Sequence, residues 1–274
     1  MPAGVTFFVK ALGAAPPTPF DREWTDRLLG EMASRTGVPE EALQKRPAPF
    51  AISSPLPAEG HRPGGEANPD EGGRFRLRLS WLVDADLKGL LDWARSLRVD
   101  PVRVETNCGQ MLFEDALVSP TLTHRWNRWV LYGRLYEEAS DCLRVVTLKF
   151  YSPTTLERSG LPYPLPDPCG MFLGYSRIWD AFSGIALDQG LREAIEEQLL
   201  LVDFRIQRRL SEAEKVAVPG FVGSAKFRLA GRHPESILKG LNALADYAFF
   251  CGTGIGTEHG MGLTRRLLDD EGRA

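Results

Sequence analysis

The chain has little of what several classes of protein require. Only four of its 274 residues are cysteines, and no two of them form a C-x-x-C pair, so neither a zinc site nor a disulfide framework is predicted. No apolar run approaches the roughly 18 residues of a membrane-spanning helix, and the first residues lack the charged and apolar regions of a signal peptide. We therefore expect a soluble, cytoplasmic protein without a membrane segment, bound metal or cofactor.

An excess of positive charge is also absent. Lys and Arg number 33 against 36 Asp and Glu, and the net charge is −3, which argues against a protein that coats nucleic acid indiscriminately. One stretch, residues 201–232, is nevertheless basic, with seven cations against three carboxylates: Arg205, Arg208, Arg209, Lys215, Lys226, Arg228 and Arg232 against Asp203, Glu212 and Glu214. Such a stretch suits phosphate neutralisation, but an ordinary solvated strand pair would carry the same charges.

Glycine, in contrast, is concentrated near the end of the chain, in a segment that we call the glycine loop (residues 252–262). Glycine lets the backbone adopt positive φ or approach a ligand closely. A dinucleotide fingerprint needs an acidic residue about 20 positions further on, and a P-loop ends in Gly-Lys-Ser/Thr. Only twelve residues follow Gly262 and no lysine follows Lys239, so both are excluded. Either the loop amides bind an anion, or the glycines only let a helix pack closely on a strand.

Hydrophobic periodicity predicts two similar halves. Strands are expected over 5–12, 50–56, 74–81, between residue 97 and Val130, over 143–151, 202–210 and 216–229, and after the glycine loop. Helices are expected over 21–33, 84–97, 171–200 and 234–249. The strand over 74–81 should leave Arg74, Arg76 and Arg78 on its solvent face. Two β-α-β-β-α-β sets predict an α+β fold of two tandem ferredoxin-like, or RRM-like, domains, residues 1–138 and 139–274, with antiparallel sheets that face a central cleft.

Four short segments, taken in chain order, resemble one family. They are Pro49–Leu56 (PFAISSPL), Phe150–Leu156 (FYSPTTL), Pro219–Gly223 (PGFVG) and the glycine loop. This pattern is similar to that of the CRISPR repeat-RNA endoribonucleases, the pre-crRNA processing family of the RAMP superfamily. The resemblance implies metal-independent cleavage of precursor crRNA, in which a ribose 2′-OH attacks the adjacent phosphate and leaves a 2′,3′-cyclic phosphate.

Such cleavage needs a base for the 2′-OH proton, a cation for the phosphorane and an acid for the leaving 5′ oxygen. Many members of the family use a histidine of the N-terminal domain, but here no histidine precedes His61, and Gln44 stands where relatives carry a histidine. An amide takes no proton. The candidate catalytic residues are therefore Lys45 and Arg46, which follow Gln44, and His259 in the glycine loop, because imidazole titrates near neutral pH.

The other histidines are weaker candidates. His61 lies in a stretch rich in Gly and Pro, and His233 is expected at the surface beside a helix start. His124 precedes Trp126 and Trp129; this group could stack unpaired bases or belong partly to the core.

The candidate RNA-binding residues combine the glycine loop with nearby cations: Gly252, Gly254, Gly256, Gly260, Gly262, Lys215, Lys226, Arg265 and Arg266. The resemblance implies CRISPR repeat RNA or crRNA as the partner, together with subunits of a CRISPR effector complex. Three functions remain open: a repeat-RNA endoribonuclease, a RAMP-type subunit that binds guide RNA without cutting it, and a nucleotide- or cofactor-binding enzyme unrelated to RNA, which the order of the motifs disfavours.

Overall fold

The computed structural model describes residues 1–13, 22–57, 73–84, 87–106, 109–119, 126–211 and 218–267. The described chain divides into two compact units. Unit 1 contains the described residues up to Trp129 together with Glu258–Gly260, and unit 2 contains the remainder from Val130 onward. The sequence candidates His61, His124 and Lys215 lie outside the described residues.

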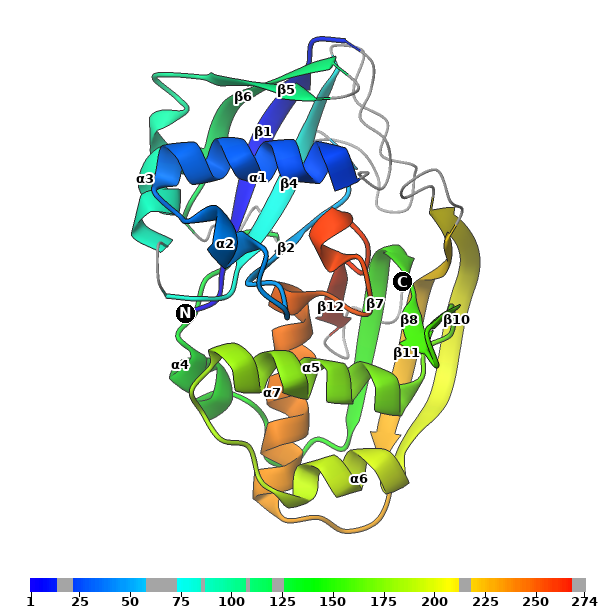
Figure 1. Ribbon diagram of the computed structural model, residues 1–274. Coiled ribbons are helices and arrows are strands. Elements are labelled where there is room, and N and C mark those ends of the chain that lie inside the picture. Colours follow the sequence, from blue (N-terminus) through cyan, green and yellow to red (C-terminus); the bar gives the residue numbers. More distant parts are fainter. Residues whose placement is uncertain are drawn as a thin grey trace. The chain divides into compact units, whose positions relative to one another are not determined.

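Unit 1 is a mixed layer of antiparallel strands and helices (Figure 1). Its elements are β1 (Ala3–Ala11), α1 (Arg22–Thr36), α2 (Glu40–Leu43), β2 (Phe50–Ile52), β3 (Leu56–Pro57), β4 (Arg74–Trp81), α3 (Leu87–Ser96), β5 (Val102–Thr106) and β6 (Gly109–Leu117). The sheet order is β2-β4-β1-β6-β5, and β3 also pairs with β4. The order β2-β4-β1-β6, with α1 and α3 as the connections, is that of a ferredoxin-like fold.

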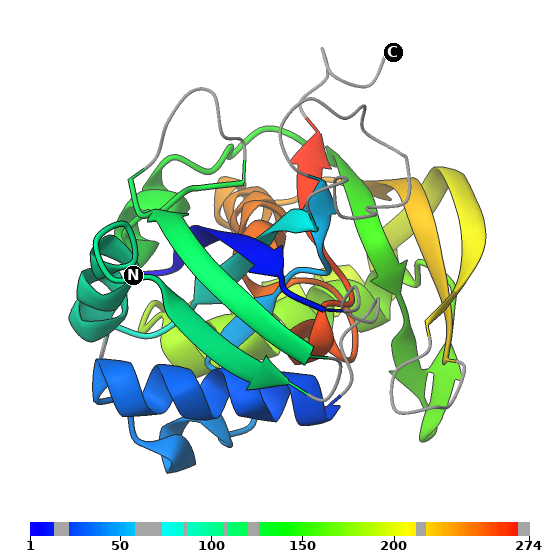
Figure 2. The same ribbon diagram turned by 90° about the horizontal axis from the view of Figure 1, so that it is seen from above.

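The core of unit 1 forms where α1 and α3 pack on this sheet, and Figure 2 shows α1 running along it. Trp24, Leu28 and Met32, which follow one another at helical spacing in α1, are all buried, as the periodicity predicts. From α3, Trp93 packs against Phe7 of β1, with ring centroids 5.4 Å apart. Burial of aromatic side chains of this size is the main source of stability of such a layer.

The opposite face of β4 differs from the sequence prediction. Arg78 was expected on a solvent face, but it is only 2% exposed. Its Nε donates to the Trp126 carbonyl oxygen at 2.9 Å, and the Gly4 amide donates to the Arg128 carbonyl oxygen at 2.7 Å. The chain around Trp126 therefore covers this face of the sheet. Alternation alone cannot predict such a cover, because it comes from a segment distant in sequence.

Unit 2 repeats the ferredoxin-like pattern. Its elements are α4 (Tyr132–Glu137), β7 (Val145–Thr154), β8 (Leu156–Arg158), β9 (Leu161–Tyr163), α5 (Pro168–Phe182), α6 (Gly190–Gln198), β10 (Leu199–Ser211), β11 (Val218–Leu229), α7 (Glu235–Cys251) and β12 (Thr264–Leu267). The sheet order is β10-β11-β7-β12, and β10 and β11 form a long hairpin (Figure 1). The predicted α+β fold with two ferredoxin-like sets is thus confirmed.

Two predicted elements of the chain are each divided in the structure. The helix expected over 171–200 consists of α5 and α6, because Gly184 adopts φ 67° and Trp179 donates its Nε1 hydrogen to the Ile185 carbonyl oxygen at 2.8 Å, which fixes the intervening turn. The strand expected over 50–56 is divided into β2 and β3, between which Ser53 forms a separate bridge with Gly260.

Along the chain, the boundary between the two compact units falls between Trp129 and Val130. The sequence predicts a domain boundary between residues 138 and 139. Helix α4 precedes the predicted boundary, yet its Tyr132 hydroxyl lies 3.0 Å from the Tyr247 hydroxyl of α7. The domain assignment and the cleft between the sheets stay predictions. Across the described residues, no helix is long and apolar enough to cross a membrane.

Candidate active site and basic sheet face

The glycine loop lies between α7 and β12, as the sequence predicts, and all five of its glycines have positive φ. The chain itself explains these conformations. A Cβ on Gly254 would overlap the Thr155 carbonyl oxygen, and one on Gly262 would overlap the Thr253 carbonyl oxygen. The glycines therefore let this loop fold closely on itself and on the end of β7. Their contact with RNA stays a prediction.

Several backbone amides of the glycine loop form hydrogen bonds within the protein. Ile255 N donates to Thr155 O, Gly262 N to Pro153 O and Thr253 N to Gly262 O, each at 2.9 Å. The amides of Gly252 and Met261 likewise donate to the carbonyl oxygens of Ala248 and Gly256, so these five amides are not available to an anion. An anion nest could use only the remaining amides of the loop.

A buried hydroxyl cluster fixes the start of the loop. Thr253 Oγ1 lies 2.6 Å from both the Tyr175 hydroxyl and Thr264 Oγ1. Burial raises the pKa of Tyr175 well above its usual value, and the hydrogen bond with Thr253 opposes this shift only in part. Tyr175 is therefore a neutral phenol with a structural role.

The part of the loop that belongs to unit 1 brings two of the three catalytic candidates together. Arg46 Nη2 lies 3.4 Å from Glu258 Oε1, and the next residue, His259, places Nδ1 3.1 Å from Thr25 Oγ1 of α1. The Arg46 side chain is 66% exposed and that of Glu258 20%, so this ion pair is weak and leaves the guanidinium accessible. Lys45 is exposed as well.

The following residue of the loop is also fixed on unit 1. Gly260 O accepts hydrogen bonds from Ser54 N at 3.1 Å and from Ser54 Oγ at 2.6 Å, and a Cβ on Gly260 would lie 3.0 Å from Ser54 N. Ser54 belongs to the PFAISSPL segment that carried the family resemblance. Two of the four motifs therefore meet here, and this contact could not be predicted from the sequence because it depends on the tertiary fold.

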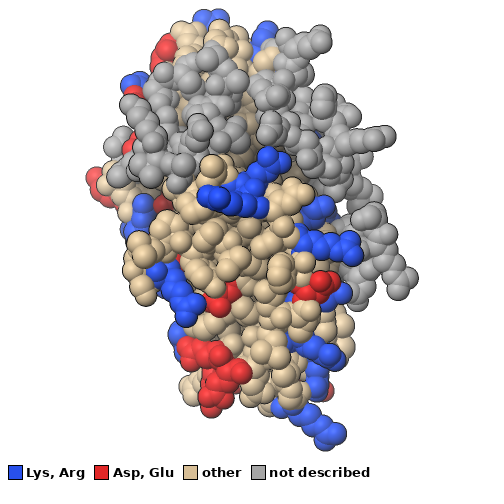
Figure 3. All heavy atoms as spheres, turned by 90° about the vertical axis from the view of Figure 1, so that its right-hand side faces the viewer, with Lys and Arg blue, Asp and Glu red and all other residues tan. Residues whose placement is uncertain are grey.

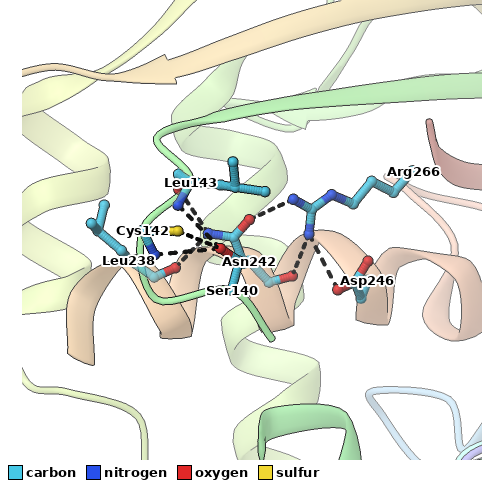
Figure 4. A network of polar contacts seen from close by, with 7 residues as sticks. All are labelled: Ser140, Cys142, Leu143, Leu238, Asn242, Asp246 and Arg266. Carbon is cyan, nitrogen blue, oxygen red and sulfur yellow. Dashed lines mark hydrogen bonds and ion pairs between the residues drawn. The ribbon is translucent and has the colours of Figure 1, made fainter. Parts of the chain in front are cut away.

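The two arginines after the loop have different environments. The side chain of Arg266 is 9% exposed. Its Nη1 lies 3.2 Å from Asp246 Oδ2, and its Nη2 donates to Asn242 Oδ1 at 2.5 Å (Figure 4). Asn242 in turn donates to the carbonyl oxygens of Leu143 and Leu238 at 2.8 Å each. Arg266 thus ties β12 to α7. Its RNA contact stays a prediction, and its geometry indicates a structural role.

Arg265 lies on the other face of the sheet, because neighbours along a strand point to opposite sides. Its cross-strand neighbour is Lys149 of β7. Lys149 in turn lies opposite Ser224 of β11, and Ser224 lies opposite Arg205 of β10. Residues directly opposite in antiparallel strands share a face. Arg265, Lys149 and Arg205 therefore form a row of cations across the sheet, on the face without helices.

We call this surface the basic sheet face, and define it by Lys149, Arg205, Lys226, Arg228 and Arg265. Lys226 pairs with Asp203 across the hairpin, and Lys226 and Arg228 are exposed. Figure 3, which views the side of the molecule that carries β10 in Figure 1, shows more basic than acidic groups. The sequence missed Lys149, which lies outside the basic stretch; the alternation of buried and partly exposed residues along β7 is the signal that places it on this face.

The remaining described histidine does not join either site. One ring nitrogen of His233, Nε2, lies 2.7 Å from the Ala230 carbonyl oxygen, in the connection between β11 and α7. This contact gives His233 a local structural role.

Two ferredoxin-like sets and a glycine loop before the final strand agree with the fold that the sequence resemblance implies. Residues 148–264 match the family model of the CRISPR-associated endoribonuclease Cas6. A Mycobacterium tuberculosis protein described as CRISPR-associated endoribonuclease Cas6 is 30% identical over 195 residues, which is 70% of this chain and 60% of that protein.

Solved structures agree. A Cas6 product complex is 27% identical, with a TM-score of 0.77, over 97% of this chain and 100% of that chain. Thermus thermophilus Cas6 is 25% identical, with a TM-score of 0.72, over 97% of this chain and 98% of that chain. The chain is thus similar to Cas6 endoribonucleases over nearly its whole length.

Proposed function

We propose that this protein binds CRISPR repeat RNA and cleaves precursor crRNA without a metal ion, by attack of a 2′-OH that leaves a 2′,3′-cyclic phosphate. The observation that carries the proposal is the placement of His259 beside the Arg46–Glu258 pair, in a chain that is similar to Cas6 endoribonucleases. The imidazole can transfer protons, and the accessible guanidinium can stabilise negative charge; this chemistry requires both.

Each candidate has one role. His259 exchanges protons with the RNA, because it is the described histidine that lies in the glycine loop. Arg46 stabilises the phosphorane through its accessible guanidinium, and Lys45, the adjacent exposed residue, adds a second cation. Gln44 is exposed too, but its amide can only orient a hydroxyl group.

The basic sheet face is proposed to hold the RNA backbone. A row of cations across four strands favours phosphate contact, and Tyr151 of β7, whose ring lies 5.1 Å from Lys149 Nζ, offers an aromatic surface for an unpaired base. We place the activity in the cytoplasm, where thiols such as that of the exposed Cys142 remain reduced.

One observation favours a second candidate function. Because Gln44 replaces the expected histidine, the chain could instead bind guide RNA as a RAMP-type subunit of a CRISPR effector complex without cutting it. Both functions use the same basic sheet face, so RNA binding alone does not separate them.

Single-turnover incubation of the purified protein with the repeat RNA of its own locus, in EDTA, tests the proposal. We expect a product that ends in a 2′,3′-cyclic phosphate, and no product from RNA with a 2′-deoxy nucleotide at the scissile position. Binding without cleavage of the natural RNA would favour the non-cleaving subunit, and failure to bind the RNA would refute both functions.

A further inference from the structure

Thr25 of α1 and His259 of the glycine loop are 234 residues apart in the chain, yet their side chains meet at 3.1 Å. Thr25 is 1% exposed, and its helix neighbours Trp24 and Leu28 belong to the apolar core. A buried hydroxyl must form hydrogen bonds, since an unsatisfied one is costly. The Thr25 hydroxyl therefore has polar contacts in an apolar environment, and the contact with His259 joins it to the glycine loop.

The backbone that follows His259 is fixed, because Gly260 O accepts two hydrogen bonds from Ser54. On the other side, Glu258 contributes only the weak ion pair with Arg46. Rotation of the imidazole is therefore the main freedom left, and the contact between Nδ1 and Thr25 removes it. The second ring nitrogen, Nε2, is then the one available to a substrate.

We propose that Thr25 is a positioning residue for His259: its hydroxyl oxygen accepts a hydrogen bond from Nδ1–H, so that proton exchange with RNA takes place at Nε2. This inference rests on the proposed function. A threonine hydroxyl has one proton and two lone pairs, and in a helix it commonly donates that proton to a backbone carbonyl. Thr36, in the same helix, donates to Met32 O at 2.7 Å.

The direction of this hydrogen bond matters for the chemistry. With a proton on Nδ1, the neutral imidazole has its lone pair on Nε2, and the protonated ring keeps the same Nδ1–H bond. In the base step, Nε2 takes the 2′-OH proton while that oxygen bonds to phosphorus; the bond from phosphorus to the 5′ oxygen breaks, and that oxygen takes a proton from water. The charged residues adjacent in sequence to the two members of this contact are Glu258, which pairs with Arg46, and Asp26, next to Thr25 on α1.

Matched variants test the role in catalysis. Thr25→Val removes the acceptor at nearly constant shape, and we expect the single-turnover rate at saturating RNA to fall about tenfold or more, a part of the roughly 10²- to 10⁴-fold contribution of a general base. RNA affinity should not change, and Thr25→Ser should restore the rate. Thr36→Val, which removes a hydroxyl from the same helix, is the control. A wild-type rate in Thr25→Val would overturn the inference.

A double-mutant cycle separates positioning from a general loss of structure. In a His259→Ala background, Thr25→Val should lower the rate no further, because its effect acts through the imidazole. An equal further loss would show that Thr25 supports only the fold. If His259→Ala itself cleaves normally, the inference fails while the proposed function stands.

A spectroscopic measurement is independent of cleavage. Nitrogen-15 spectra of the imidazole groups, with the His259 signals assigned by their absence in His259→Ala, should show the Nδ1–H tautomer in the RNA-free wild type. Thr25→Val should shift this ring toward the Nε2–H tautomer. A dominant Nε2–H tautomer in the wild type would refute the hydrogen bond as proposed, whether or not the protein cleaves RNA.

Discussion

At the scale of single residues, neighbours in the sequence have different roles that the sequence could not separate. Arg265 and Arg266 both follow the glycine loop, and each was a candidate for RNA. They differ because successive side chains of β12 point to opposite faces of the sheet. Arg266 points to α7 and contacts Asn242 and Asp246, while Arg265 lies beside Lys149 on the other face. Residue type gave the charge, but the direction of each side chain came from the strand register.

This difference gives a matched pair of variants. Arg265→Ala should weaken repeat-RNA binding and lower the slope of log affinity against log salt by about one, with little effect on stability. Arg266→Ala should leave that slope unchanged but destabilise the protein by about 1–3 kcal/mol, because buried Asn242 loses a charged partner. Urea unfolding and filter binding measure the two effects. The same loss of affinity in both variants, with no loss of stability, would contradict the assignment.

The catalytic candidates make a second prediction at this scale. His259→Ala should lower the single-turnover rate by at least about tenfold and flatten its pH dependence between about pH 5 and pH 9, because the proton carrier is removed. A Lys45→Ala/Arg46→Ala double variant should lower the rate but keep the shape of the pH profile, because it removes only charge stabilisation. Full activity in both variants would eliminate all three residues.

At the scale of elements, periodicity predicted the strands and the glycine loop well, because both depend on local chemistry. It could not show that the PFAISSPL segment meets the loop through Ser54 and Gly260, since such a contact depends on the tertiary fold. The tertiary fold also limits which substitutions can test the loop. Because φ is 72° at Gly256 and 92° at Gly260, Gly256→Val and Gly260→Val are strained whether or not RNA is present.

Gly254 offers a sharper test of the loop as an element. An alanine there would place a Cβ against the Thr155 carbonyl oxygen and would need φ 83°, so we expect Gly254→Ala to lower the free energy of unfolding by about 2 kcal/mol or more. Gly133→Ala in α4, where a Cβ has open space, should be neutral or stabilising by up to about 1 kcal/mol. Thermal unfolding without RNA is the measurement, and an unaltered melting temperature for Gly254→Ala would show that the loop can rearrange.

At the scale of the whole molecule, charge distribution matters more than net charge. The protein carries −3 overall, yet the described cations Lys149, Arg205 and Arg265 line up on one face of one sheet. The basic stretch in the sequence predicted part of this face, but not Lys149, because strand pairing brings β7 between β11 and β12. A long-range attraction for RNA can therefore arise on an acidic protein, and salt should weaken it.

The slope of log affinity against log salt tests this surface. Replacing Lys149 and Lys226 together by alanine should reduce the slope by about two, since each phosphate contact contributes roughly 0.7 to 0.9. The matched control replaces Arg177 of α5 and Arg192 of α6, which are exposed cations on helices of the same unit. It changes the net charge by the same amount, and its slope should stay close to that of the wild type. Equal slopes for the two double variants would show that the RNA responds to total charge alone, and would place its backbone away from the basic sheet face.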